Sequence, residues 1–267
     1  METVSQEFSD QKQSYFTRLG REQKQAFKLH KASGLWDRED GKKEWGNVSK
    51  HCLVEIARVD ILANTLGLSE EITNDLKTAA ALHDFYKKGE VQNLDNGGLN
   101  WASFEKSVAE AESEMYEAGF SDRVIRLASA IGHGHPKSII RAEQLLNQPL
   151  SAEDMAFLIM HYVDSYTVGS DRVNSPETLE DGQKINDIDR RYLKIAQNPR
   201  INDLNEAGRE YFHGETLVAT QRRVAHLVED KLAELVSKKN NRPIDPLDLP
   251  NFIDQELHAR IEHLFIH

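Results

Sequence analysis

Apolar residues recur with a helical period along most of this chain. In residues 48–66 they lie about 3.6 positions apart, and the pattern stops at Gly67. Ser69 is of a type that caps helices, and Glu70 and Glu71 follow where the start of a helix favours negative charge. The pattern therefore predicts a helix over 48–66 and a second one that begins after Ser69 and runs through the sequence LKTAAALHDF.

Further helices are predicted downstream. Ser151 and Asp154 have the spacing of a capping box, in which two side chains bond main-chain N–H groups at the start of a helix. The helix that they open carries the apolar run Phe-Leu-Ile-Met and then His161 and Asp164. No run of alternating β-branched residues predicts a strand, so we expect an all-α fold. Helical periodicity also predicts helices over 104–118, 122–131, 205–237 (with a break near His213-Gly214) and 252–265.

Composition and charge narrow the class of protein. The chain has 267 residues, 39% of them hydrophobic, which is enough for a sizeable core in a single domain. It holds no apolar run of the about 18 residues that a membrane-spanning helix needs. Its one cysteine, Cys52, excludes an intrachain disulfide, so we expect a cytoplasmic protein. A net charge of −11 argues against binding to extended nucleic acid, whose phosphates need a basic surface.

Four ionisable residues stand in an order that suits a metal site: His51, the doublet His83-Asp84, and Asp164. Imidazole nitrogens and carboxylate oxygens together suit a divalent metal ion such as Mn, Fe, Co, Zn or Mg. The doublet follows the run Ala-Ala-Ala-Leu, and Asp164 follows Phe-Leu-Ile-Met. Charged groups at the end of apolar helix segments are costly without a partner, and a cation would compensate them.

The order His … His-Asp … Asp resembles that of the HD-domain metal-dependent phosphohydrolase superfamily. His51 in VSKHCL matches the first histidine, LHDF supplies the doublet, and Asp164 in HYVDSY resembles the last aspartate. The resemblance covers about residues 48–168. It implies an HD-domain-like helical bundle, with an N-terminal arm and loop over 1–47 and C-terminal helices over 190–267 that pack on this core as part of one domain.

The resemblance also implies a chemistry. The four residues would surround one divalent cation, which lowers the pKa of a coordinated water and neutralises phosphoryl oxygens. Water would then attack phosphorus without a covalent enzyme intermediate. The implied substrate is a small phosphorylated metabolite, with a nucleotide favoured. We expect no partner among nucleic acids or membranes, while the late helices could form the interface of a homodimer.

Four more residues are candidates for the site. Lys87 completes the sequence His-Asp-Phe-Tyr-Lys, which resembles a His-Asp-x-x-Lys form whose lysine contacts the substrate or the site; its alternative role is a favourable charge at a helix C-terminus. His133 and His135, in AIGHGHP, stand where the family often places a histidine that faces the phosphate or a second metal, and His133 is slightly preferred. His161 shares a helix face with Asp164 and could be a further ligand, a neighbour that supports a ligand, or a surface residue. The last two are favoured.

One metal ion is expected rather than two. Two-metal members of the superfamily need further histidines between the doublet and the last aspartate, and the segment FEKSVAEAESEM, where some members place one, has none. His133, His135 and His161 could still complete a second site. A diiron oxygenase of the same fold, acting on a polyol or phosphonate, is therefore one alternative, and a non-catalytic nucleotide-binding regulatory module is the other.

Three polar loops and an arginine pair lie next to the proposed site residues in the sequence. Loops over 31–47, 89–100 and 169–189 each lie next to a proposed ligand, an arrangement that favours lids over a site. Arg190-Arg191 could bind phosphate groups, because the forked N–H donors of arginine suit phosphate oxygens. Solvated surface pairs are commoner, so we expect both arginines at the surface.

Overall fold

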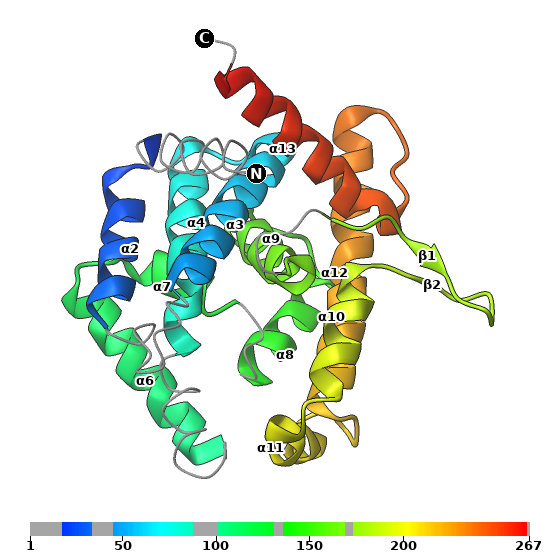
Figure 1. Cartoon of the computed structure of the whole chain (residues 1–267), viewed down its shortest axis with the longest axis horizontal. Helices are drawn as coiled ribbons and strands as arrows, with labels where there is room; N and C mark the ends of the chain where they lie inside the picture. The colour runs from blue at the N-terminus through cyan, green and yellow to red at the C-terminus, as the bar shows by residue number, and fades with distance from the viewer. Residues whose placement is uncertain (1–17, 34–44, 88–100, 131–135, 169–172, 266–267) are drawn as a thin grey trace, which may run out of the picture.

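The computed structural model describes residues 18–33, 45–87, 101–130, 136–168 and 173–265 (Figure 1). Over these residues the regular structure is helical except for one hairpin of two strands with two residues each, which confirms the predicted all-α class. The elements are, in chain order, α2 (Arg21–Ala32), α3 (Trp45–Leu66), α4 (Glu70–Leu82), the 3-10 turn η1 (His83–Tyr86), α6 (Trp101–Glu117), α7 (Asp122–Ala128), α8 (Pro136–Leu145), α9 (Ala152–Tyr166), β1 (Glu177–Thr178), β2 (Lys184–Ile185), α10 (Asp187–Ala196), η2 (Pro199–Ile201), α11 (Asn202–Ala207), η3 (Gly208–Glu210), α12 (Leu217–Asn240), η4 (Pro246–Asp248) and α13 (Leu249–Phe265).

Helix α9 lies at the centre of this arrangement. It contacts α3 and α4 on one side and α12, α10 and α8 on the other (Figure 1). A helix whose faces are all covered needs apolar residues all round it, and the run of Leu158, Ile159, Met160, Tyr162 and Val163 is fully buried. Polar residues near the C-terminal end of α9 are therefore buried as well.

The remaining helices pack around this centre. Both α2 and α7 contact α4, α13 contacts α3, and η4 contacts α12. The buried guanidinium of Arg58 on α3 holds α13 in place, because its Nε and Nη2 donate to Asp254 Oδ1 over 3.1 and 2.9 Å. In the part of the chain that the structure describes, no helix combines the length and the apolar character that crossing a membrane requires.

Local signals set the ends of the helices near the centre. Gly67 ends α3 with a φ of 76°, a conformation that glycine adopts without strain. The Ser69 side chain accepts a hydrogen bond from the N–H of Ile72, as its capping role predicts. The predicted capping box of Ser151 and Asp154 is also confirmed, since both of its bonds form at the start of α9.

Other parts of the fold differ from the sequence prediction. The periodic segment 205–237 is divided into α11, η3 and α12, and the predicted break is confirmed by the positive φ of His213 (53°) and Gly214 (93°). Helices α2, α8 and α10 and the hairpin β1–β2 were not predicted. Both α8 and α10 have ten residues, and helices this short depend on tertiary packing, which α12 supplies for both.

Candidate metal centre

Four buried side chains from three parts of the chain converge where α3, η1 and α9 meet. His51 and Glu55 lie one turn apart on α3, His83 begins η1, and Asp164 lies near the end of α9. Each offers one ligand atom, and these four atoms all lie within 4.8 Å of one another. The group could therefore hold a divalent metal ion.

The two imidazoles face each other through the same type of atom. His51 Nε2 lies 3.2 Å from His83 Nε2. The other nitrogen of His83, Nδ1, lies 2.8 Å from the carbonyl oxygen of Ala80, which can only accept a hydrogen bond. Because a neutral imidazole has a single N–H, this bond leaves a lone pair on the His83 Nε2. Two metal–nitrogen bonds of about 2.1 Å, at an angle of about 100°, place their nitrogens about 3.2 Å apart, so the observed distance fits two ligands of one cation.

Glu55 is the member of the group that the sequence analysis does not identify. Its Oε1 lies 3.1 Å from His51 Nε2 and its Oε2 lies 3.2 Å from His83 Nδ1. The side chain is fully buried, and within the described residues neither oxygen accepts a hydrogen bond of normal geometry. Such a carboxylate is costly unless a cation compensates it. A signal exists in the sequence, because Glu55 interrupts the apolar face formed by Cys52 and Val59.

Burial and charge act in opposite directions on the groups of this centre. Burial dominates at His51 and lowers its pKa to about 4. Burial also acts to lower the pKa of His83, but Glu55, Asp84 and Asp164 outweigh it and raise that pKa to about 9. The Glu55 pKa rises to about 8, mainly because the side chain is buried. The carboxylates thus favour a positive charge at this place, carried either by a proton on His83 or by a metal ion that replaces it.

Asp84 lies next to the four-residue group and is not one of its members. Its Oδ1 is 3.0 Å from His83 Nε2, and its Oδ2 is 4.0 Å from His51 Nε2. The same Oδ1 is 2.6 Å from Lys87 Nζ, which places the predicted lysine beside the centre. Burial acts to lower the pKa of Lys87, but Asp84 and Asp164 raise it, so the ammonium stays charged. The role of Asp84 as a ligand remains a prediction.

Arg191, on α10, holds Asp164 in position. Its Nη2 lies 3.1 Å from both carboxylate oxygens of Asp164, so a single charged nitrogen contacts both of them. Its Nη1 donates to the main-chain carbonyl groups of Asp164 and Thr167, the latter over 2.8 Å. The side chain is only 17% exposed. The expectation that this arginine lies at the surface is therefore wrong, because α10 packs across the end of α9.

The remaining predicted histidines have different outcomes. His161 is buried, so a surface position is excluded, and its Nδ1 donates to the carbonyl of Ala130 over 2.8 Å. Its Nε2 has no hydrogen-bond partner within the described residues, and it is not part of the four-residue group. His133 and His135 lie outside the residues that the structure describes, so their predicted roles stay predictions.

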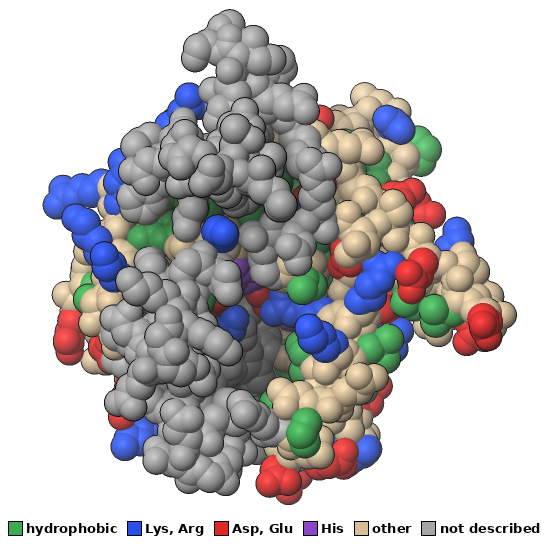
Figure 2. Space-filling view, in the orientation of Figure 1, with side chains coloured by type: hydrophobic (Ala, Val, Ile, Leu, Met, Phe, Trp, Pro, Cys, Tyr) green, Lys and Arg blue, Asp and Glu red, His purple; other side chains and the backbone are tan. Residues whose placement is uncertain are grey.

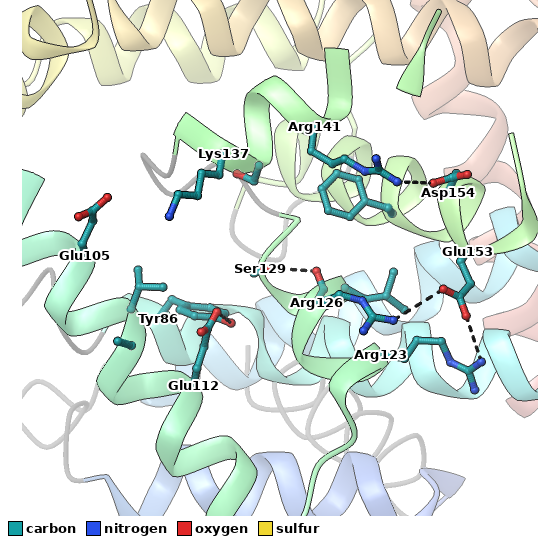
Figure 3. A pocket seen from close by; sticks show the side chains of 15 residues that line it. Tyr86, Glu105, Glu112, Arg123, Arg126, Ser129, Lys137, Arg141, Glu153 and Asp154 are labelled. Atoms are coloured by element: carbon teal, nitrogen blue, oxygen red, sulfur yellow. Dashed lines mark hydrogen bonds and ion pairs between the residues drawn. The ribbon is translucent and has the colours of Figure 1, made fainter. Parts of the chain in front are cut away.

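Basic side chains lie near the middle of one face. Figure 2 shows Lys and Arg side chains beside a hollow there, with a His side chain visible at its edge. A cavity of about 750 Å³ includes Tyr86, which belongs to the same 3-10 turn as His83. In this cavity Arg141 pairs with Asp154, while Lys137 points into the open space (Figure 3).

No protein-family model matches the chain, and neither the curated proteins nor the solved structures contain a match to it.

Proposed function

We propose that this chain is a metal-dependent phosphohydrolase that releases phosphate from a small phosphorylated metabolite, with a nucleotide as the favoured substrate. The observation that carries the proposal is the pair of Nε2 atoms of His51 and His83, 3.2 Å apart among buried carboxylates. Imidazole and carboxylate donors in one buried group are typical of hydrolytic metal sites. The order of these residues along the chain also resembles that of the HD-domain superfamily, whose core would correspond to residues 48–168.

A divalent cation held by this group supplies Lewis acidity: it lowers the pKa of a water molecule and neutralises phosphoryl oxygens. The chain's own residues then have separate tasks. Glu55, His51, His83 and Asp164 provide the donor atoms. Lys87 holds a positive charge 2.6 Å from Asp84, where it can also attract the oxygens of a phosphate group.

The cavity of about 750 Å³ supports a nucleotide-sized substrate, because ligand sites for such molecules commonly have volumes of about 300–1,000 Å³. Val108, Leu127 and Phe157 provide apolar contacts in it, while Tyr86 connects it to the turn that bears His83. We place the organic part of the substrate in this cavity and the phosphate at the metal centre.

One observation favours the diiron oxygenase as second candidate. The buried Nε2 of His161 has no hydrogen-bond partner within the described residues, and a second metal ion would use its lone pair. Counting metal ions in purified protein separates the two proposals. One ion per chain, with no oxygen consumption on polyols or phosphonates, supports the hydrolase, and two iron ions support the oxygenase.

The direct test is metal-dependent phosphate release. Protein treated with a chelator would be reloaded with Mn, Fe, Co, Zn or Mg and assayed on a panel of nucleotides and sugar phosphates. We expect phosphate release only with metal, and its loss in His51→Asn. The matched control is His213→Asn, at an exposed histidine whose positive φ asparagine tolerates. Absence of metal binding and of phosphate release from every substrate would refute the proposal and leave the non-catalytic regulatory module.

A further inference from the structure

The last turn of α9 is held by two arginines that come from different helices. Asp164 lies in this turn, and Thr167 follows the turn as the C-terminal cap of the helix. Arg58 reaches Thr167 from α3, and Arg191 reaches it from α10. Since Asp164 is a candidate metal ligand, the contacts of this turn decide where its carboxylate lies.

Thr167 connects the two arginines through its side chain and its main chain. The residue is 1% exposed. Its hydroxyl donates its one hydrogen to the carbonyl oxygen of Val163 over 2.6 Å, so it acts as the acceptor for Arg58 Nη1, which lies 2.8 Å away. Its main-chain carbonyl oxygen accepts a hydrogen bond from Arg191 Nη1, also over 2.8 Å. Both arginines and Thr167 therefore belong to one buried group of hydrogen bonds.

The other contacts of Arg58 keep its guanidinium in one place. The side chain is 1% exposed, and Asp254 on α13 accepts hydrogen bonds from its Nε and Nη2. The guanidinium carbon lies 5.0 Å from the centre of the Tyr166 ring, so the cation also contacts the residue before Thr167. Arg58 stands three positions after Glu55 on α3. The helix that carries two candidate ligands thus also holds the turn that carries Asp164.

The position of this turn matters to the candidate metal centre. Asp164 Oδ1 lies 3.8 Å from the Nε2 atoms of both His51 and His83. Metal–ligand bonds to nitrogen and oxygen are about 2.0–2.2 Å long in such sites, so small shifts of the turn change whether the carboxylate can reach the ion. Arg191 contacts this carboxylate directly. Arg58 acts on it only through the end of α9.

We propose that Arg58 and Thr167 are positioning residues of the candidate metal centre. They hold the last turn of α9 against α3 and thereby keep the Asp164 carboxylate within reach of a bound ion. The inference rests on the proposed function only in that it needs a metal ion, and it is independent of the substrate. Groups that support metal ligands without touching the metal typically change metal affinity about 10- to 100-fold when they are lost.

The test removes the Thr167 hydroxyl and keeps the shape of the side chain. Mn would be titrated by calorimetry into chelator-treated Thr167→Val, in which Arg58 Nη1 loses this acceptor. We expect an affinity about tenfold lower than that of the natural chain. Thr167→Ser keeps the hydroxyl and should bind Mn like the natural chain. The matched control is Thr65→Val on α3, whose hydroxyl also donates to the carbonyl group four positions earlier, and it should leave the affinity unchanged.

Unfolding measurements separate positioning from a purely structural role. Urea denaturation of metal-free protein gives the free energy of unfolding of each variant. A residue with only a structural role would lower this free energy and leave the Mn affinity of the folded protein unchanged. Equal Mn affinity in Thr167→Val and the natural chain therefore overturns the proposal, whatever the change in stability. If Thr167→Val does not fold, Thr167→Ala is measured with the same expectation, because it removes the hydroxyl without placing a methyl group against Arg58.

Failure of this inference can be told from failure of the proposed function. Metal binding without phosphate release from any substrate refutes the phosphohydrolase, while the Mn titrations still decide the roles of Arg58 and Thr167. Phosphate release together with equal Mn affinity in Thr167→Val refutes only the positioning roles. If the natural chain binds no divalent metal, both proposals fail.

Discussion

His51 Nε2 and His83 Nε2 lie 3.2 Å apart, although 32 positions separate the two residues in the chain. The contact depends on α3 and α4, which pack side by side and bring the start of one helix to the end of the other. The pair is surrounded by carboxylates, so its geometry is compatible with two ligands of one cation.

We predict that Glu55→Gln weakens metal binding about 10- to 100-fold, in the range found when a group that supports or forms a metal site is lost. The amide keeps the volume of the carboxylate but removes a negative charge from the four-residue group. Calorimetric titration of Mn into chelator-treated protein measures the change. The matched control is Glu180→Gln, at an exposed glutamate in the hairpin turn. Equal Mn affinity in Glu55→Gln and the natural chain would exclude Glu55 from the site.

Replacing Arg191 should destabilise the fold more than replacing an exposed arginine. Arg191→Met leaves the buried Asp164 carboxylate without the hydrogen bonds from Nη2, and breaking a buried ion pair typically lowers the free energy of unfolding by about 3 kcal/mol. Arg209→Met removes a surface pair with Glu206 and should cost less than about 1 kcal/mol. Urea denaturation of metal-free protein compares the two variants. Similar losses in both would show that Arg191 does not hold Asp164.

The contact of α10 with α12 should depend on pH through His226 and Asp189. Partial burial acts to lower the pKa of His226, but hydrogen bonds to Asp189 and Glu229 raise it from 6.5 to about 9. Burial acts to raise the pKa of Asp189, but bonds from His226 and from the main chain of Asn186 lower it from 3.8 to about 2. Folding therefore favours the protonated histidine and the ionised aspartate.

The sign of the pH dependence follows from these shifts. The stabilisation of the fold by protonated His226 is complete below about pH 6.5 and is lost as the pH rises through about 9. The stabilisation by ionised Asp189 is complete above about pH 4 and is lost as the pH falls through about 2. The stability difference between the natural chain and His226→Gln should therefore be largest near pH 5–6, at about 1–2 kcal/mol after solvent screening. Urea denaturation across this range measures it, and a difference that does not change between pH 6 and 10 would contradict the prediction.

Asp254 anchors α13 and should be needed for stability mainly while Arg58 is present, because its one other hydrogen bond within the described residues comes from the main-chain N–H of Val173. Asp254→Ala leaves the buried Arg58 guanidinium without its carboxylate and should cost about 3–5 kcal/mol. The double variant Arg58→Met, Asp254→Leu removes both charges and should be more stable than Asp254→Ala alone. Thermal and urea denaturation give the comparison. If the double variant is the less stable of the two, the ion pair stabilises the fold by more than the mutual neutralisation of its two buried charges.

Helix positions near the centre were predictable because their signals are local. The period of the apolar residues over 48–66, the cap at Ser69 and the box of Ser151 and Asp154 all act within a few positions along the chain. The short helices α8 and α10 were missed because their stability comes from α12, which follows both in the sequence. The spacing of apolar residues within a ten-residue segment gives no information on its packing against α12.

Some of the candidate ligands could likewise be predicted from the sequence, while others are identified only by the tertiary structure. The sequence by itself determined that His51, His83 and Asp164 stand on or next to apolar helices, where an ionisable side chain needs a compensating charge. Only the tertiary structure decided that Glu55 joins them, and that Arg191 holds Asp164 from 27 positions away. The physical reason is that helical periodicity specifies which face of a helix is buried, whereas the packing of all helices around α9 decides which buried charges meet.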